Sequence, residues 1–252
     1  MRKIWCSKQY SGIFWAIITA CAFVAISLWG AQFLSGVPWY IFSSALRFIF
    51  GFMILFIINK LYGRPLKDVL STKRSKAAFI AGNGFVIFFI YYLLVWCSGI
   101  TAIKGLTIGL FLSKIILQQI ATGFYEELNY RVLVLEGYFH GTQNTKRRLI
   151  YGFLSFLLFA AVHVVDGWSI SRFLLSGAIG FSFAVMYLKS RNILLPMLFH
   201  FIYDIFANFT SFIEWNQSPV FVNLNSISDI VLIIMFVISF IMLLTKGKDN
   251  SD

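Results

Sequence analysis

Charged side chains are scarce in this sequence. They make up 12% of its 252 residues, whereas soluble domains carry about 25%. Hydrophobic residues make up 59%, the mean hydropathy is +0.81, and several apolar runs reach the roughly 18 residues that a spanning helix needs. The shortage of charge therefore excludes a soluble domain and predicts an all-α fold, a polytopic transmembrane helical bundle.

Cysteine is also rare, with Cys6, Cys21 and Cys97 the only three. An odd number of widely spaced cysteines excludes a disulfide framework and a cysteine-based metal site. The net charge of +11 raises the question of nucleic acid, but the basic residues cluster between the apolar runs and do not line a helix face with aromatics. We therefore expect the lipid bilayer, and no nucleic acid, as a partner.

Eight apolar runs predict about eight spans within a single membrane domain, residues 1–252. Sixteen of the 21 Lys and Arg residues fall on one side of the bundle if both termini are cytoplasmic. The positive-inside rule makes that orientation the expected one, in a multi-pass protein of the cell membrane. The predicted spans are Gly12–Leu34, Trp39–Leu61, Ala77–Cys97, Ser113–Phe139, Leu149–Val165, Phe173–Leu188, Ile193–Ile213 and Ile227–Leu244.

Two adjacent acids lie inside the fourth run. Glu126 and Glu127 are followed by Arg131, and each unpaired charge at the centre of a spanning helix costs about 2.5–3.5 kcal/mol. Glu127 and Arg131 stand at i,i+4 and can form a buried structural pair. Glu126 points about 100° away around the helix and has no local partner, so it is the first candidate for chemistry. Arg47, in the second run, also has no partner that the sequence suggests.

Two histidines lie in later runs. His163 ends the fifth run, and His200 lies in the seventh with Asp204 at i+4 on the same helix face. A glutamate with an imidazole beside it can deprotonate a water, and a second imidazole, oriented by a carboxylate, can stabilise the oxyanion that follows attack on a peptide carbonyl. Each histidine has a simpler interpretation as a hydrogen-bonded helix contact.

The same side chains also make a metal-ligand set. Glu126, His163 and His200 would give a catalytic zinc three ligands and an open fourth position. The residues alone therefore leave two mechanisms open, water activation by Glu–His and water activation by zinc.

Signatures of other intramembrane hydrolases are absent. The chain has no His-Glu-x-x-His zinc helix, no Gly-x-Ser-Gly serine loop, and no Gly-x-Gly-Asp partner for its Tyr203-Asp204 pair. Three motifs in three successive apolar runs instead resemble the CPBP family. These are the CAAX proteases and bacteriocin-processing enzymes, also called Abi proteins, and they are related to type II CAAX prenyl endopeptidases. The motifs are Glu126-Glu127-x-x-x-Arg131, Phe159-x-x-x-His163 and His200-x-x-x-Asp204.

The resemblance covers residues 113–209, which it implies are the catalytic core. It leaves residues 1–112 as N-terminal spans and residues 210–252 as a C-terminal span with a basic tail. It also implies a membrane-embedded peptidase that needs no cofactor, with zinc as the alternative. The implied roles are water activation for Glu126 and His163, the oxyanion side for His200 and Asp204, and shaping of the site for Glu127 and Arg131.

Two residues depart from the family pattern. Asp204 stands where Asn is common, and Val132 follows Arg131 where Gly is common. A carboxylate near a developing oxyanion is unfavourable unless it is protonated or holds His200. Neither departure removes a residue that the resemblance assigns to water activation.

Two functions from different classes follow from this pattern. The first is an intramembrane endopeptidase that hydrolyses a membrane-associated peptide or C-terminal segment, such as a bacteriocin precursor, a pheromone or a lipidated CAAX-like substrate. The second is a catalytically silent member of the same family that acts in bacteriocin self-immunity or regulates a sensor kinase, with a membrane protein as partner. The presence of both water-activating residues favours the enzyme. A transporter would predict two related halves with broken helices, and no such symmetry is visible.

Overall fold

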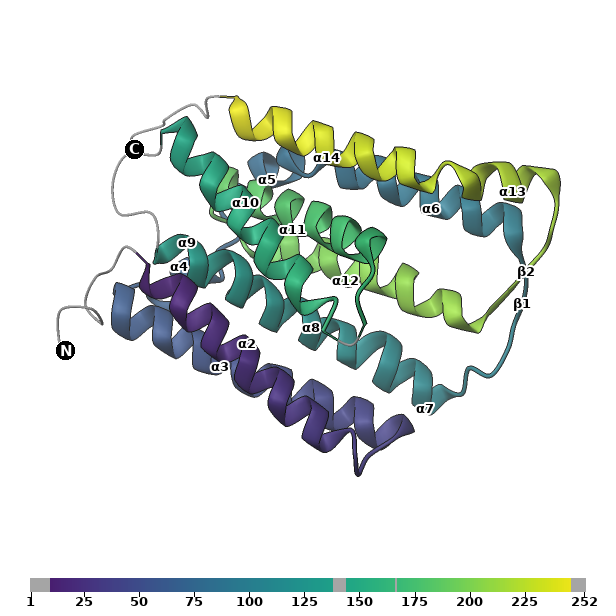
Figure 1. Cartoon of the computed structure of the whole chain (residues 1–252), viewed down its shortest axis with the longest axis horizontal. Helices are drawn as coiled ribbons and strands as arrows, with labels where there is room; N and C mark the ends of the chain where they lie inside the picture. The colour runs from purple at the N-terminus through teal and green to yellow at the C-terminus, as the bar shows by residue number, and fades with distance from the viewer. Residues whose placement is uncertain (1–9, 138–143, 166, 246–252) are drawn as a thin grey trace.

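Helices make up almost all of this chain. The computed structural model describes residues 10–137, 144–165 and 167–245 (Figure 1). The basic residues in 1–9 and 246–252, on which part of the topology prediction depends, lie outside the described residues, as does Phe139. The elements are α2 (Ser11–Gly30), α3 (Gly36–Tyr62), α4 (Leu66–Val69), α5 (Ser75–Ala81), α6 (Asn83–Gly99), β1 (Ile100–Ile103), α7 (Ile108–Leu110), η1 (Phe111–Leu117), α8 (Gln118–Glu127), η2 (Leu128–Leu133), α9 (Val134–Glu136), α10 (Thr145–Val162), α11 (Ile170–Ser190), α12 (Leu194–Phe209), η3 (Thr210–Phe212), β2 (Ile213–Trp215), α13 (Pro219–Ser226) and α14 (Ser228–Leu244).

The described helices confirm a multi-pass helical membrane protein. Five segments of the described chain are long and apolar enough to cross a membrane, and α5 with α6 makes a sixth if this pair, bent by 63°, counts as one span. Each of the eight predicted spans contains helix. Two of them form elements that differ from ordinary spans: α10 carries three basic residues near its start, and α12 has only 16 residues. The five segments are Ser11–Gly30, Gly36–Tyr62, Ile108–Glu136, Ile170–Ser190 and Pro219–Leu244.

Local sequence explains where several helices begin and end. The Asn144 side chain accepts a hydrogen bond from the Arg147 backbone N–H at 2.9 Å and caps α10. Ser218 caps α13 in the same way, ahead of a proline in the first turn. Gly63 takes a left-handed conformation, with φ of 66°, directly after α3, and this conformation ends the helix at little cost because glycine has no Cβ.

The helices form three groups in space (Figure 1). The pair α2–α3 lies on one flank, the pair α6–α14 on the other, and α8, α10, α11 and α12 fill the middle. The helix α2 starts and α14 ends at the same end of the bundle. A two-stranded antiparallel ribbon of β1 and β2 closes the opposite end, with Ile103 opposite Ile213. The ribbon is the one departure from an all-α fold within the described chain.

The segment Ile108–Glu136 is the centre of the bundle. Every residue from Tyr125 to Leu135 is buried, and a helix buried on all sides must be enclosed by other helices. The flanking helices instead expose large apolar side chains such as Phe52, Phe56 and Ile233, as expected for lipid-facing surfaces. Two parts of the central segment, η1 and η2, are wound as π-helix, a form that is frequent at functional sites.

Candidate active site

The acid pair lies at the junction of α8 and η2, where the central segment is most deeply enclosed. Glu127 and Arg131 both have fully buried side chains, and Arg131 Nη2 lies 3.1 Å from Glu127 Oε1. The predicted i,i+4 pair is therefore confirmed. The side chain of Glu126 is 11% exposed, so the neighbouring acid reaches the edge of the buried region.

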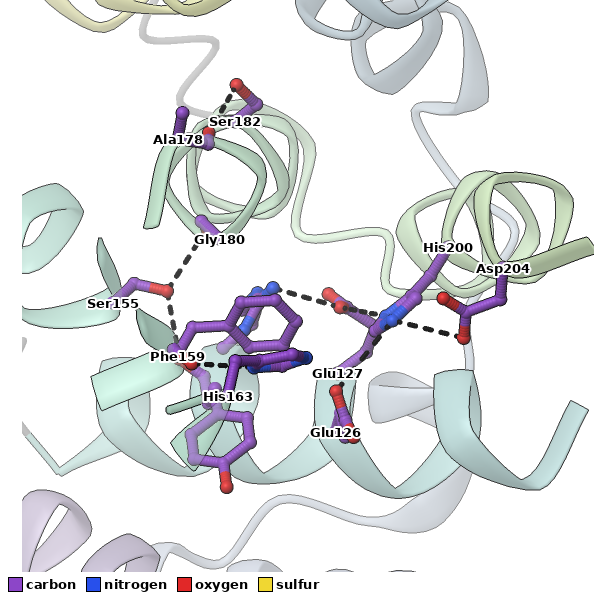
Figure 2. Close-up of polar contacts among 12 residues, drawn as sticks. Glu126, Glu127, Ser155, Phe159, His163, Ala178, Gly180, Ser182, His200 and Asp204 are labelled. Carbon is purple, nitrogen blue, oxygen red and sulfur yellow. Dashed lines mark hydrogen bonds and ion pairs between the residues drawn. The ribbon is translucent and has the colours of Figure 1, made fainter. Parts of the chain in front are cut away.

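His200 enters this acid cluster from α12. Its Nδ1 lies 2.9 Å from Glu127 Oε1 and donates a hydrogen bond to it, because a carboxylate oxygen can only accept. Its Nε2 lies 3.5 Å from Asp204 Oδ2 and 3.8 Å from Glu126 Oε2. Figure 2 shows the ring between these carboxylates. The closest carboxylate to His200 is thus Glu127, on another helix, and not Asp204 as the i+4 spacing suggested.

His163 follows the last residue of α10 and points toward the same region. Its Nδ1 donates a hydrogen bond to the carbonyl oxygen of Phe159 at 2.7 Å. A neutral imidazole carries one proton, so this bond places the proton on Nδ1 and leaves Nε2 as an acceptor. In the view of Figure 2 the free edge of the ring faces Glu126. The half-buried His163 ring can therefore act as a base.

Aromatic side chains form the wall that joins the two histidines. The Phe159 ring lies 4.3 Å from the ring of His163 and 5.7 Å from that of His200, centroid to centroid. The Phe183 ring stacks on His200 at 5.1 Å, with an interplanar angle of 21°. Sequence reasoning missed Phe183, because one phenylalanine among 29 in an apolar helix gives no signal of its own.

The same two rings also cover the buried guanidinium. Arg131 Cζ lies 4.4 Å above the Phe159 ring and 5.5 Å from the Phe183 ring. Such cation–π contacts contribute about 0.5–2 kcal/mol each, more when the cation is desolvated. One aromatic wall therefore positions the histidines and stabilises the cation that pairs with Glu127.

Close helix packing brings α12 within reach of the acids. A Cβ built on Gly123 would lie 3.0 Å from the carbonyl oxygen of Met197 and 3.7 Å from the Cβ of His200. A larger residue at position 123 would push the two helices apart, since small residues let membrane helices approach closely. Gly123 therefore sets the separation that the bond between Glu127 and His200 requires.

Residues 108–206 match the family model described as type II CAAX prenyl endopeptidase Rce1-like. The match supports the CAAX protease family for this segment, which is less than half of the chain. The family resemblance noted in the sequence is therefore confirmed, and all six predicted site residues fall inside the matched range. No curated protein and no solved structure matches the chain.

Metal binding was the alternative that the sequence left open. In the described parts of the chain, no group of three or more His, Cys, Asp or Glu side chains is placed to hold a metal ion. The alternative zinc set of Glu126, His163 and His200 is not arranged as such a group, so we derive no step through a metal.

One charged residue near the site lies outside the Rce1-like segment. Arg47 of α3 has its guanidinium 4.9 Å from the Phe23 ring, and that ring lies 4.8 Å from the ring of Tyr125, the residue before Glu126. The sequence showed Arg47 as a charge without a partner, because Phe23 lies on another helix.

Proposed function

We propose that this protein is an intramembrane endopeptidase that cleaves a membrane-associated peptide or C-terminal segment through a water activated by Glu126 and His163. The observation that carries the proposal is that two bases, Glu126 and His163, lie at the same aromatic wall. Glu126 offers a carboxylate, and His163 keeps Nε2 unprotonated because its Nδ1 donates to the Phe159 carbonyl. A general base needs this free acceptor within reach of the proton it removes.

The chemical step follows from these groups. Water attacks the peptide carbonyl carbon, its proton passes to Glu126 or His163, and a carbon–oxygen bond forms as the carbonyl oxygen becomes an oxyanion. The tetrahedral intermediate then collapses, the carbon–nitrogen bond breaks, and the same proton goes to the leaving amine. The products are a new carboxyl terminus and a new amino terminus, and water is the one other reactant consumed.

His200 supplies the donor on the oxyanion side. Its Nδ1 donates to Glu127, so the ring must also carry a proton on Nε2 to donate to an oxyanion. Positioned donors of this kind lower the barrier because they are already aimed at the charge that develops. Arg131 holds Glu127, and Glu127 holds His200, so the buried pair is a support for the oxyanion donor.

The substrate class is part of the proposal. The family description supports a CAAX-type membrane protease, and a site buried among spanning helices suits a substrate that is already anchored in the bilayer. Small membrane peptides such as bacteriocin precursors or pheromones, and lipidated CAAX-like termini, all meet that requirement.

The test is a cleavage assay on purified protein in lipid nanodiscs. The probes are a synthetic farnesylated peptide ending in a CAAX box and an unlipidated apolar peptide of similar length, with products identified by mass spectrometry. We expect the wild type to cleave at least one probe and the Glu126→Gln and His163→Ala variants to lose about 10²–10⁴-fold in rate, the range for a positioned acid–base group. Both variants should still insert in the membrane.

Two results would overturn the proposal. One is the absence of cleavage of either probe by the wild type, which would favour a silent scaffold. The other is full cleavage by Glu126→Gln, which would show that Glu126 does not activate the water. A parallel arm contains a strong chelator. We expect the same turnover with and without the chelator. A turnover that is lost in the chelator and restored by added zinc would instead show that a metal activates the water.

A further inference from the structure

Two cations meet at the end of α14. The backbone carbonyl oxygen of Thr245, the residue directly after α14, accepts a hydrogen bond from Arg148 Nη1 at 2.9 Å. Lys189 Nζ donates to the same oxygen and lies 3.4 Å from the Thr245 hydroxyl oxygen. Because both side chains reach one oxygen, their positive charges lie close together. Arg148 belongs to α10 and Lys189 to α11, so three helices build this cation cluster.

No acid of the described chain balances the cation cluster. The carboxylates that form ion pairs there do so with other cations, namely Arg64, Lys104, Arg131, Arg191 and His200. The C-terminus of a helix carries about half a negative charge, so the end of α14 offsets only part of two positive charges. Like charges held this close repel each other, and an anion beside them would remove that repulsion.

The guanidinium of Arg148 is held in place and still has donors to spare. The residue is 8% exposed, and its Nη2 donates to Thr145 Oγ1 at 3.3 Å. Its buried Nε has no hydrogen-bond partner among the described residues. A guanidinium has five N–H donors in one plane, whereas the described chain offers this one only the Thr245 and Thr145 oxygens. The half-buried Lys189 lies beside it, so the cluster is arranged before any anion binds.

The cation cluster lies where spanning segments end. The segment that contains α11 ends at Ser190, one residue after Lys189, and the segment that contains α14 ends at Leu244, one residue before Thr245. Figure 1 shows the start of α10, where Arg148 lies, beside the end of α14. The ends of spanning helices lie at the level of the lipid headgroups, and basic pockets between such helices bind phosphate-bearing headgroups.

We propose that Arg148 and Lys189 bind the phosphate of an anionic membrane lipid. The phosphate oxygens accept hydrogen bonds from the remaining donors of both side chains, and the negative charge offsets the repulsion between them. A zwitterionic lipid carries the same phosphate together with an ammonium group, so it binds more weakly. No residue of the acid–histidine site takes part, and the lipid site therefore does not depend on the proposed peptidase activity.

Lipid-dependent thermal unfolding of the full-length protein in detergent tests the site. The probes are dioctanoyl phosphatidylglycerol, dioctanoyl phosphatidylcholine and inorganic phosphate at equal concentrations. We expect phosphatidylglycerol to raise the unfolding midpoint of the wild type, because a ligand that binds the folded state stabilises it. The other two probes should raise the midpoint by less than half as much. An equal shift with phosphatidylcholine or with inorganic phosphate would overturn the assignment to an anionic lipid.

Variants show where the lipid binds. Arg148→Gln and Lys189→Gln should each lower the phosphatidylglycerol shift by half or more, whereas Lys189→Arg, which keeps the charge, should retain most of it. Lys76→Gln is the matched control, because it removes an exposed cation from α5, and it should leave the shift unchanged. Equal losses for Lys76→Gln and Lys189→Gln would show non-specific attraction to a basic surface and would refute the site.

Each shift is taken relative to the lipid-free midpoint of the same variant. A variant that only weakens the hydrogen bonds at the end of α14 therefore keeps a normal lipid shift, and such a result for both Arg148→Gln and Lys189→Gln would refute the site. If Arg148→Gln does not fold, Lys189→Gln and Lys189→Arg decide the question.

The acids of the C-terminal tail are the alternative anions for the cation cluster. Asp249 and Asp252 follow Thr245 in the sequence and lie outside the described residues. A variant with both Asp249→Asn and Asp252→Asn should show the wild-type phosphatidylglycerol shift. A larger shift in this variant would mean that the tail competes for the two cations, and it would overturn the assignment of the site to lipid.

Discussion

Removing the negative charge of Glu127 should destabilise the protein far more than removing that of its neighbour. In Glu127→Gln, the buried guanidinium of Arg131 loses its partner at 3.1 Å, and breaking one side of a buried ion pair costs about 3–5 kcal/mol. The cation–π contacts of Arg131 with Phe159 and Phe183 are retained, and the new amide oxygen still accepts a hydrogen bond. We therefore expect a loss near the lower limit, about 3 kcal/mol.

Glu126→Gln is the matched control. It makes the same chemical change one residue earlier, at an acid whose nearest cationic partner is His200 Nε2, 3.8 Å away, and whose side chain is partly exposed. Its cost in stability should be below about 1 kcal/mol, as for a weak pair. The two variants should therefore separate stability from activity, because Glu126→Gln is expected to be folded and inactive.

Thermal unfolding of the detergent-purified protein, followed by tryptophan fluorescence, measures the difference. For a chain of this size, about 3 kcal/mol corresponds to a Tm lower by roughly 6–12 °C. The double variant Glu127→Gln with Arg131→Met should recover most of this loss, because it removes the buried guanidinium that Glu127→Gln leaves unpaired. Equal Tm shifts for Glu126→Gln and Glu127→Gln would refute the reasoning.

Two other predictions concern packing and the surface of the bundle. Gly123→Val should push α12 away from α8, cost about 1–3 kcal/mol in thermal unfolding and lower cleavage through His200. Gly167→Ala, where no atom lies within 4 Å of the added Cβ, should leave both unchanged. Glu136→Gln releases Arg64 and Arg191, at 2.6 and 3.0 Å. Because both arginine side chains are partly exposed to solvent, the change should cost less than about 1 kcal/mol. A loss as large as that of Glu127→Gln would contradict the expected difference between a partly exposed and a fully buried ion pair.

The sequence by itself determined the class of the protein and the local part of its site. Shortage of charge and long apolar runs are sufficient for a helical membrane protein, because an uncharged stretch of spanning length can satisfy its backbone in lipid only as a helix. The pairing of Glu127 with Arg131 was equally readable, since residues at i,i+4 on a helix are neighbours whatever surrounds them. The family motifs could be read because the residues of each motif lie within six positions of one another along the chain.

Partners across helices were decided only by the tertiary structure. The i+4 spacing favoured Asp204 as the carboxylate that orients His200, but the closest approach is that of Glu127, 73 residues away in the chain. Arg47, without a partner in the sequence, lies over the ring of Phe23 on another helix, α2. Such pairings depend on how deeply each helix sits and how closely two backbones approach. These quantities are set by many weak contacts along whole helices, so no single motif encodes them.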